Sequence, residues 1–165
     1  MKKFINDFYQ YFLFVISQTI FVFCDYIFVN SNEPISVHIS LFFITLIVTL
    51  LTLTVRTAFE IVYLSIVVKV FKRSFGVRDI VKIMFTSMKY SSILAIIFLI
   101  IQLIFIRRTA EIYQIVALSI INILYMVMVC IKLHKKGYGK GPIIAFAIYI
   151  LGYMAMQITN IVTLI

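Results

Sequence analysis

The chain has 165 residues, of which 64% are hydrophobic and only 13% are charged, and its mean hydropathy is +1.13. Soluble domains are roughly half apolar and about a quarter charged, and a soluble fold of this size could not bury so much apolar surface. The composition therefore excludes a soluble enzyme, a disordered tail and a disulfide-rich secreted domain. It indicates an all-α integral membrane protein.

Apolar runs predict five transmembrane helices within a single domain, residues 1–165. A helix needs about 20 apolar residues to cross a bilayer. The predicted spans lie at about residues 8–29, 37–71, 84–106, 112–131 and 143–165. The second run is longer than one straight crossing requires, so we expect it to tilt, kink or protrude. Residues 77–90, ahead of the third span, would place apolar side chains on one face of a helix and mostly charged side chains on the other. This pattern predicts an amphipathic helix at the membrane interface.

Basic residues set the expected orientation. The chain has 15 Lys and Arg against 6 Asp and Glu, a formal net charge of +9. Five crossings place most basic residues on one side, so we expect a cytoplasmic N-terminus and an outer C-terminus. The predicted cytoplasmic basic face includes Lys72, Arg73, Arg78, Lys82, Lys89, Lys132, Lys135, Lys136 and Lys140. Because these residues lie between apolar runs, their expected partners are anionic lipid headgroups and not nucleic acid.

The second span carries a polar stripe at helical spacing. Its members are His38, Thr45, Thr49, Thr52, Arg56, Glu60 and Tyr63. These positions fall on one face of a helix, and Arg56 and Glu60, four residues apart, are able to form an ion pair. Charges inside a membrane are costly and usually face the bundle interior. The stripe is thus a substrate path, a seam for a partner, or a set of helix–helix hydrogen bonds that stabilise the bundle.

Further polar residues in the other spans are candidate partners for this stripe. They are Gln18 and Asp25 in the first span, Asn122 and Tyr125 in the fourth, and Tyr149, Tyr153, Gln157 and Asn160 in the fifth. Ordinary interhelical hydrogen bonds are the alternative interpretation, with Asp25 as an acid near the outer interface.

The sequence predicts no enzymatic site, metal site or cofactor. Cys24 and Cys130 lie in apolar runs, and the two histidines, His38 and His134, are far apart without further ligands. No nucleophile, base and orienting group can be assembled from the residues present.

Two basic turns resemble those of the Yip family of small polytopic membrane proteins. Residues 67–81 read VVKVFKRSFGVRDIV, a Gly-containing basic turn that leads into an amphipathic segment. Residues 131–141 read IKLHKKGYGKG, a short basic turn with His and Gly before the last span. The resemblance covers about residues 45–157 and implies a small polytopic membrane protein, of a kind that in bacteria includes proteins acting beside ABC-type exporters.

We therefore expect a non-enzymatic accessory protein that binds another integral membrane protein, such as an ABC-type exporter of peptides or toxic compounds. Self-immunity against a membrane-active bacteriocin is one alternative, and a small transporter or channel lined by the polar stripe is another. A membrane-trafficking role follows from the family resemblance alone. The abundance of Lys, Ile and Phe favours a bacterial source, and hence the bacterial cytoplasmic membrane. Self-association into a homo-oligomer is a further alternative.

Overall fold

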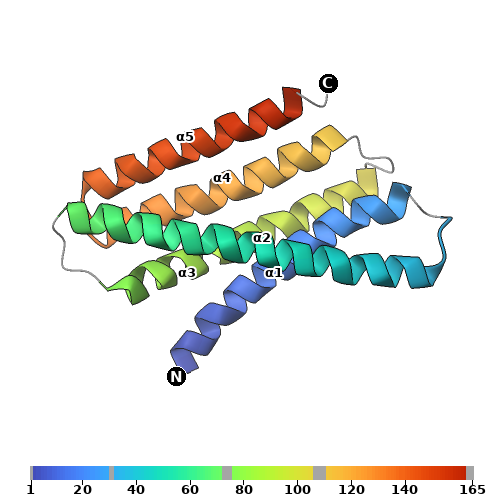
Figure 1. Ribbon diagram of the computed structural model, residues 1–165, viewed down its shortest axis with the longest axis horizontal. Helices are drawn as coiled ribbons and strands as arrows, with labels where there is room; N and C mark the ends of the chain where they lie inside the picture. Colours follow the sequence, from blue (N-terminus) through green and yellow to red (C-terminus); the bar gives the residue numbers. More distant parts are fainter. Residues whose placement is uncertain (1, 30–31, 72–75, 106–110, 163–165) are drawn as a thin grey trace.

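The computed structural model consists of α-helices. They are α1 (Lys2–Val29), α2 (Ile35–Val70), α3 (Val77–Phe105), α4 (Glu111–Lys135) and α5 (Lys140–Val162) (Figure 1). The structure describes residues 2–29, 32–71, 76–105 and 111–162, and side chains for 8–24, 26–27, 32–71, 76–104, 113, 115–153 and 155–156. Within these ranges every regular element is helical, so the predicted all-α class is confirmed.

Three described helical segments are long and apolar enough to cross a membrane. They are Ile35–Val70, Val77–Ile104 and Ile115–Lys135. Two shorter apolar segments, Phe8–Cys24 and Lys140–Tyr153, accompany them. The long second apolar run forms one continuous helix of 36 residues. At a rise of about 1.5 Å per residue such a helix is longer than the hydrocarbon core of a bilayer, which is about 30 Å thick.

The amphipathic segment and the third predicted span form one helix, α3. Of the face predicted to be apolar, Ile80, Met84 and Met88 are fully buried. Val77 begins the helix and remains half-exposed. Ser87 is also buried, and its hydroxyl donates to the carbonyl of Ile83 at 2.7 Å. That bond within the helix removes the cost of burying an unpaired hydroxyl.

The end of α4 is fixed by a glycine in the left-handed region. Gly137 has φ 75°, and its N–H donates to the carbonyl of His134 at 2.9 Å. The N–H of Tyr138 donates to the carbonyl of Leu133 at 3.2 Å. This pair of bonds is the Schellman motif, in which Gly avoids the steric penalty of a Cβ. The basic residues of the last turn also face the negative end of the helix dipole.

The core lies between α1, α3 and α4. In Figure 1, α4 runs between α3 and α5, and α2 crosses one face of the other helices. Phe14 from α1, Met84 and Met88 from α3, and Tyr125 and Met126 from α4 are all almost completely buried. Packing of this kind fixes the inner face of α4, which contributes Asn122 and Tyr125 to the candidate site.

Helix α2 is peripheral over most of its length. None of its most apolar 18-residue window is buried, whereas a third of the corresponding windows of α3 and α4 is buried. Large apolar side chains such as Phe43, Val55 and Phe59 are more than half exposed. Of the polar residues of α2, Thr57 and Glu60 are buried on its inner face.

Candidate functional site

Glu60 is the centre of a buried polar cluster in the middle of the bundle. Its side chain is 1% exposed, and the Nε of Arg56 donates to its Oε1 at 2.9 Å. The hydroxyl of Tyr125 donates to Oε2 at 2.8 Å, and that of Tyr149 donates to Oε1 at 3.3 Å. Both carboxylate oxygens are therefore engaged, by donors from α2, α4 and α5.

Arg56 links the carboxylate to the neighbouring helices. Its Nη1 donates to the Oδ1 of Asn122 at 2.6 Å, and its guanidinium carbon lies 4.7 Å from the ring centre of Tyr153. The Asn122 amide nitrogen in turn donates to the carbonyl of Leu118 at 2.8 Å. Arg56 Nη2 is buried and has no hydrogen-bond partner among the described residues. A buried donor left unpaired costs about 1–3 kcal/mol, and more when it is charged.

The structure brings together part of the predicted set. The ion pair expected between Arg56 and Glu60 is present, and Asn122, Tyr149 and Tyr153 surround it. Tyr63, one turn further along α2, donates its hydroxyl to the carbonyl of Ala145 in α5 at 2.8 Å. The C-terminal part of the polar stripe, Arg56, Glu60 and Tyr63, therefore joins α2 to α4 and α5.

The remainder of the stripe lies apart from this cluster. His38 is near the start of α2, with its ring centre 6.0 Å from that of Tyr26, and its Nδ1 has no hydrogen-bond partner in the described part of the chain. Thr45 is half-buried one turn before Thr49. The side chains of three further predicted partners, Asp25, Gln157 and Asn160, lie outside the described residues.

A cavity of about 500 Å³ adjoins the Arg56–Glu60 cluster. It is lined by residues of α1, α2, α4 and α5, among them Gln18, Thr49, Thr52 and Arg56. Gln18 is 5% exposed, and its Nε2 finds no hydrogen-bond partner among the side chains and backbone that the structure describes. Gln18, a candidate partner of the stripe, thus lies in the wall of the cavity beside Thr49, Thr52 and Arg56.

Sequence reasoning missed two polar features of the interior. Gln102 in α3 is 0% exposed, and within the described ranges neither its amide oxygen nor its nitrogen has a partner. Tyr11 and Thr54 join α1 to α2 through a hydroxyl–hydroxyl hydrogen bond of 2.6 Å. A lone amide in an otherwise apolar run was the available signal for Gln102.

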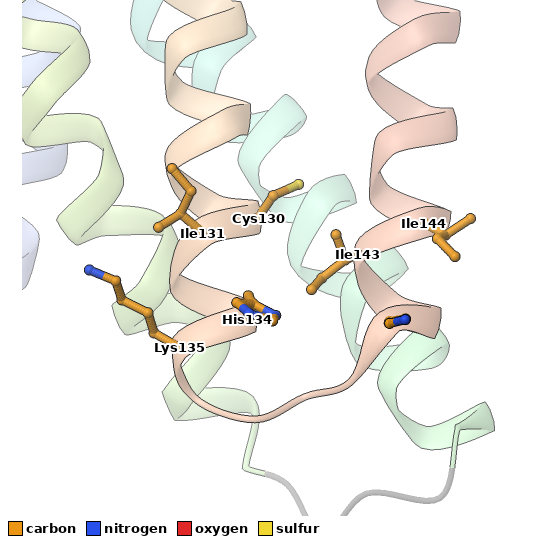
Figure 2. A pocket seen from close by; sticks show the side chains of 7 residues that line it. Cys130, Ile131, His134, Lys135, Ile143 and Ile144 are labelled. Carbon is orange, nitrogen blue, oxygen red and sulfur yellow. The ribbon is translucent and has the colours of Figure 1, made fainter.

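A second cavity, of about 420 Å³, lies between the end of α4 and the start of α5. Figure 2 shows Cys130 and His134 of α4 and Ile143 of α5 pointing toward the space between the two helices. Lys135 and Lys140 also line it, but its surface is almost entirely apolar, and Lys135 points away from the space between the helices in Figure 2. None of its lining residues is acidic.

The predicted basic face gathers at the same end of the bundle. Lys136 Nζ forms an ion pair with Asp79 Oδ1 at 3.1 Å. Lys132 Nζ lies 5.3 Å from the ring centre of Tyr90, the residue that follows Lys89. Burial raises the pKa of Tyr138 above its ordinary value, Asp79 raises it further, and Lys136 opposes this increase. Lys72 and Arg73 lie outside the described residues.

The described side chains contain no group of three or more His, Cys, Asp or Glu residues that could hold a metal ion. Both cysteines, Cys24 and Cys130, are free thiols. The contacts of the central cluster are hydrogen bonds and charge compensation.

Comparisons of the chain with protein-family models, with curated proteins and with solved structures found no match. The resemblance of residues 67–81 and 131–141 to the Yip family stays a prediction.

Proposed function

We propose that the protein is a non-enzymatic accessory protein of the bacterial cytoplasmic membrane that binds another integral membrane protein. It crosses the membrane five times, with its N-terminus in the cytoplasm and its C-terminus outside. The resemblance to the Yip family favours an ABC-type exporter of peptides or toxic compounds as the partner.

The observation that carries this proposal is the concentration of positive charge at one end of the bundle. The ends of α2 and α4 and the starts of α3 and α5 lie together there (Figure 1). The described basic residues of this end are Lys69, Arg78, Lys82, Lys89, Lys132, Lys135, Lys136 and Lys140. Asp79 is the one acid among the described residues of this end, and it is already paired with Lys136. Such a surface attracts acidic protein surfaces and anionic headgroups.

The positive end also supports the proposed orientation, because basic residues are retained on the cytoplasmic side of a membrane. The cavity between α4 and α5 lies at this end, and its almost entirely apolar lining fits the start of lipid acyl chains (Figure 2). The basic end would thus contact both headgroups and the acidic surface of the partner.

A crosslinked pull-down from native membranes, with the partners identified by mass spectrometry, tests the proposal. We expect a second membrane protein to be recovered in a fixed ratio to the chain. Replacement of Arg78 and Lys82 by Gln should reduce that recovery by roughly tenfold or more, because each basic residue near an anionic surface contributes about 1 kcal/mol.

The matched control places an equal change in net charge at the other end of α2. Asn32 and Ser36 are exposed there, and Asn32→Glu with Ser36→Glu should leave recovery unchanged. Recovery of the chain alone would contradict an accessory role and favour a self-contained immunity protein or transporter. Equal losses in the two variants would show that net charge, and not the basic end, controls the association.

A further inference from the structure

The cavity beside the Arg56–Glu60 cluster opens toward the side of the bundle. Val48 of α2 and Met156 of α5 line it and are 57% and 56% exposed, so they form its rim. The rest of the lining comes from the inner faces of α1, α2, α4 and α5. A molecule that enters here approaches from the apolar flank of the protein, which is the side that faces lipid when the helices cross a membrane.

Two buried hydrogen-bond donors in the wall of this cavity lack partners. Two buried nitrogens of lining residues, Arg56 Nη2 and Gln18 Nε2, have no hydrogen-bond partner within the described part of the structure. The carboxylate and amide oxygens beside them, on Glu60 and Asn122, already accept hydrogen bonds. A ligand that completes the site must therefore present acceptors.

The charge balance of the cluster favours a neutral ligand. Arg56 is compensated by Glu60 at 2.9 Å. An anionic ligand would add a second negative charge beside Glu60, and unbalanced charge in a membrane interior is costly. A carbonyl oxygen supplies the required acceptor without a charge.

The depth of the site restricts the ligand further. Gln18, Arg56, Asn122 and Tyr149 all lie near the middle of their helices. Tyr149, the one closest to a helix end, follows Lys140 by nine residues, or roughly 13 Å of helix. Glycerol ester groups of phospholipids lie at the bilayer interface, whereas this site lies at the level of the hydrocarbon core, which is about 30 Å thick.

We infer that the cavity between α1, α2, α4 and α5 binds a neutral, carbonyl-bearing lipid of the bilayer interior, of the isoprenoid quinone kind. Gln18 and Arg56 donate to its carbonyl oxygens. The side chains of Tyr149 and Tyr153 line the cavity and add apolar surface to its wall. A volume of about 500 Å³ lies within the range of sites for ligands of this size. The tail leaves between Val48 and Met156.

Equilibrium binding to the purified full chain in a mild non-ionic detergent, followed by native mass spectrometry, tests the inference. The probes are a menaquinone with four isoprene units, squalene as an isoprenoid without a carbonyl, and palmitate as an anionic acceptor. We expect saturable binding of one menaquinone, with squalene and palmitate at least about tenfold weaker. Equal binding of menaquinone and squalene, or tighter binding of palmitate, would overturn the inference.

Two buried glutamines provide a matched pair of variants. Gln18→Leu removes a donor from the cavity and should weaken menaquinone binding by about tenfold. Gln102→Leu removes an equally buried amide that does not line the cavity, and binding should be unchanged. Equal affinities of the two variants would count against the site.

A second pair tests the entrance without altering a buried residue. Val48→Trp places a bulky ring at the rim, whereas Val62→Trp makes the same change at a similarly exposed position of α2 away from the cavity. Only Val48→Trp should reduce menaquinone binding. Unchanged binding by Val48→Trp would show that the lipid is bound elsewhere.

Discussion

Two ion pairs of nearly equal length lie in contrasting parts of the molecule. Arg56 and Glu60 approach to 2.9 Å in the middle of the bundle, where their side chains are 17% and 1% exposed. Lys136 and Asp79 approach to 3.1 Å at the basic end, where their side chains are 43% and 54% exposed. The buried carboxylate also accepts from two tyrosine hydroxyls, Tyr125 and Tyr149.

The difference shows that distance alone does not determine what an ion pair contributes. Water solvates both partners of the exposed pair whether or not they meet, so their attraction is largely offset. In the bundle interior the two charges have lost their water, and each depends on the other and on the phenols for compensation. Breaking the buried pair should therefore be far more harmful than breaking the exposed one.

The largest expected effect is that of Arg56→Met. The substitution keeps much of the side-chain volume but leaves Glu60 as an uncompensated buried charge. We expect the free energy of unfolding to fall by about 3–5 kcal/mol. Unfolding of the detergent-solubilised protein by SDS, followed by circular dichroism, measures the change.

The double variant Arg56→Met/Glu60→Leu distinguishes the loss of both charges from the loss of one partner. It removes both charges, and we expect stability to return to within about 1–2 kcal/mol of the unmodified chain, because apolar residues commonly replace a buried ion pair without loss. A double variant as unstable as Arg56→Met would show that loss of packing, and not the unpaired charge, explains the single variant.

An intermediate effect is expected from Tyr125→Phe. The phenol of Tyr125 donates to Glu60 Oε2 at 2.8 Å, and its loss should lower the free energy of unfolding by about 1–2 kcal/mol. Tyr149→Phe removes a longer bond of 3.3 Å and should cost less. The same SDS unfolding assay ranks the two variants, and the reverse order would show that Tyr149 is the main donor to the carboxylate.

The helices and the ion pair were predictable because both depend on local spacing. Apolar runs long enough to cross a bilayer indicated each helix, and the step of four residues from Arg56 to Glu60 placed the two charged groups on one helical face. The interior position of the pair followed from the cost of exposing charges to lipid. Each of these inferences uses only residues close together in the chain.

The composition of the site depended on packing between helices and could not be predicted in detail. The polar stripe keeps to one face of α2, but different helices lie against that face along its length, so Arg56, Glu60 and Tyr63 meet α4 and α5 while His38 lies near Tyr26 of α1. Helical spacing also made Gln18 and Asn122 equal candidates for partners of the stripe, although of the two only Asn122 accepts a hydrogen bond from Arg56. The tilt of one helix against another determines such contacts, and this tilt cannot be inferred from a single sequence.

The smallest effect is expected at the exposed pair. Asp79→Asn removes the attraction to Lys136 but leaves both side chains in water, so stability should change by less than about 1 kcal/mol. Because ions screen exposed charges over about 10 Å at 0.1 M salt, even this small change should fade as salt is added. The destabilisation by Arg56→Met should persist in the same titration, since its source is a charge shielded from solvent. A salt-independent loss in Asp79→Asn would instead indicate that Asp79 stabilises the start of α3, where it lies in the first turn.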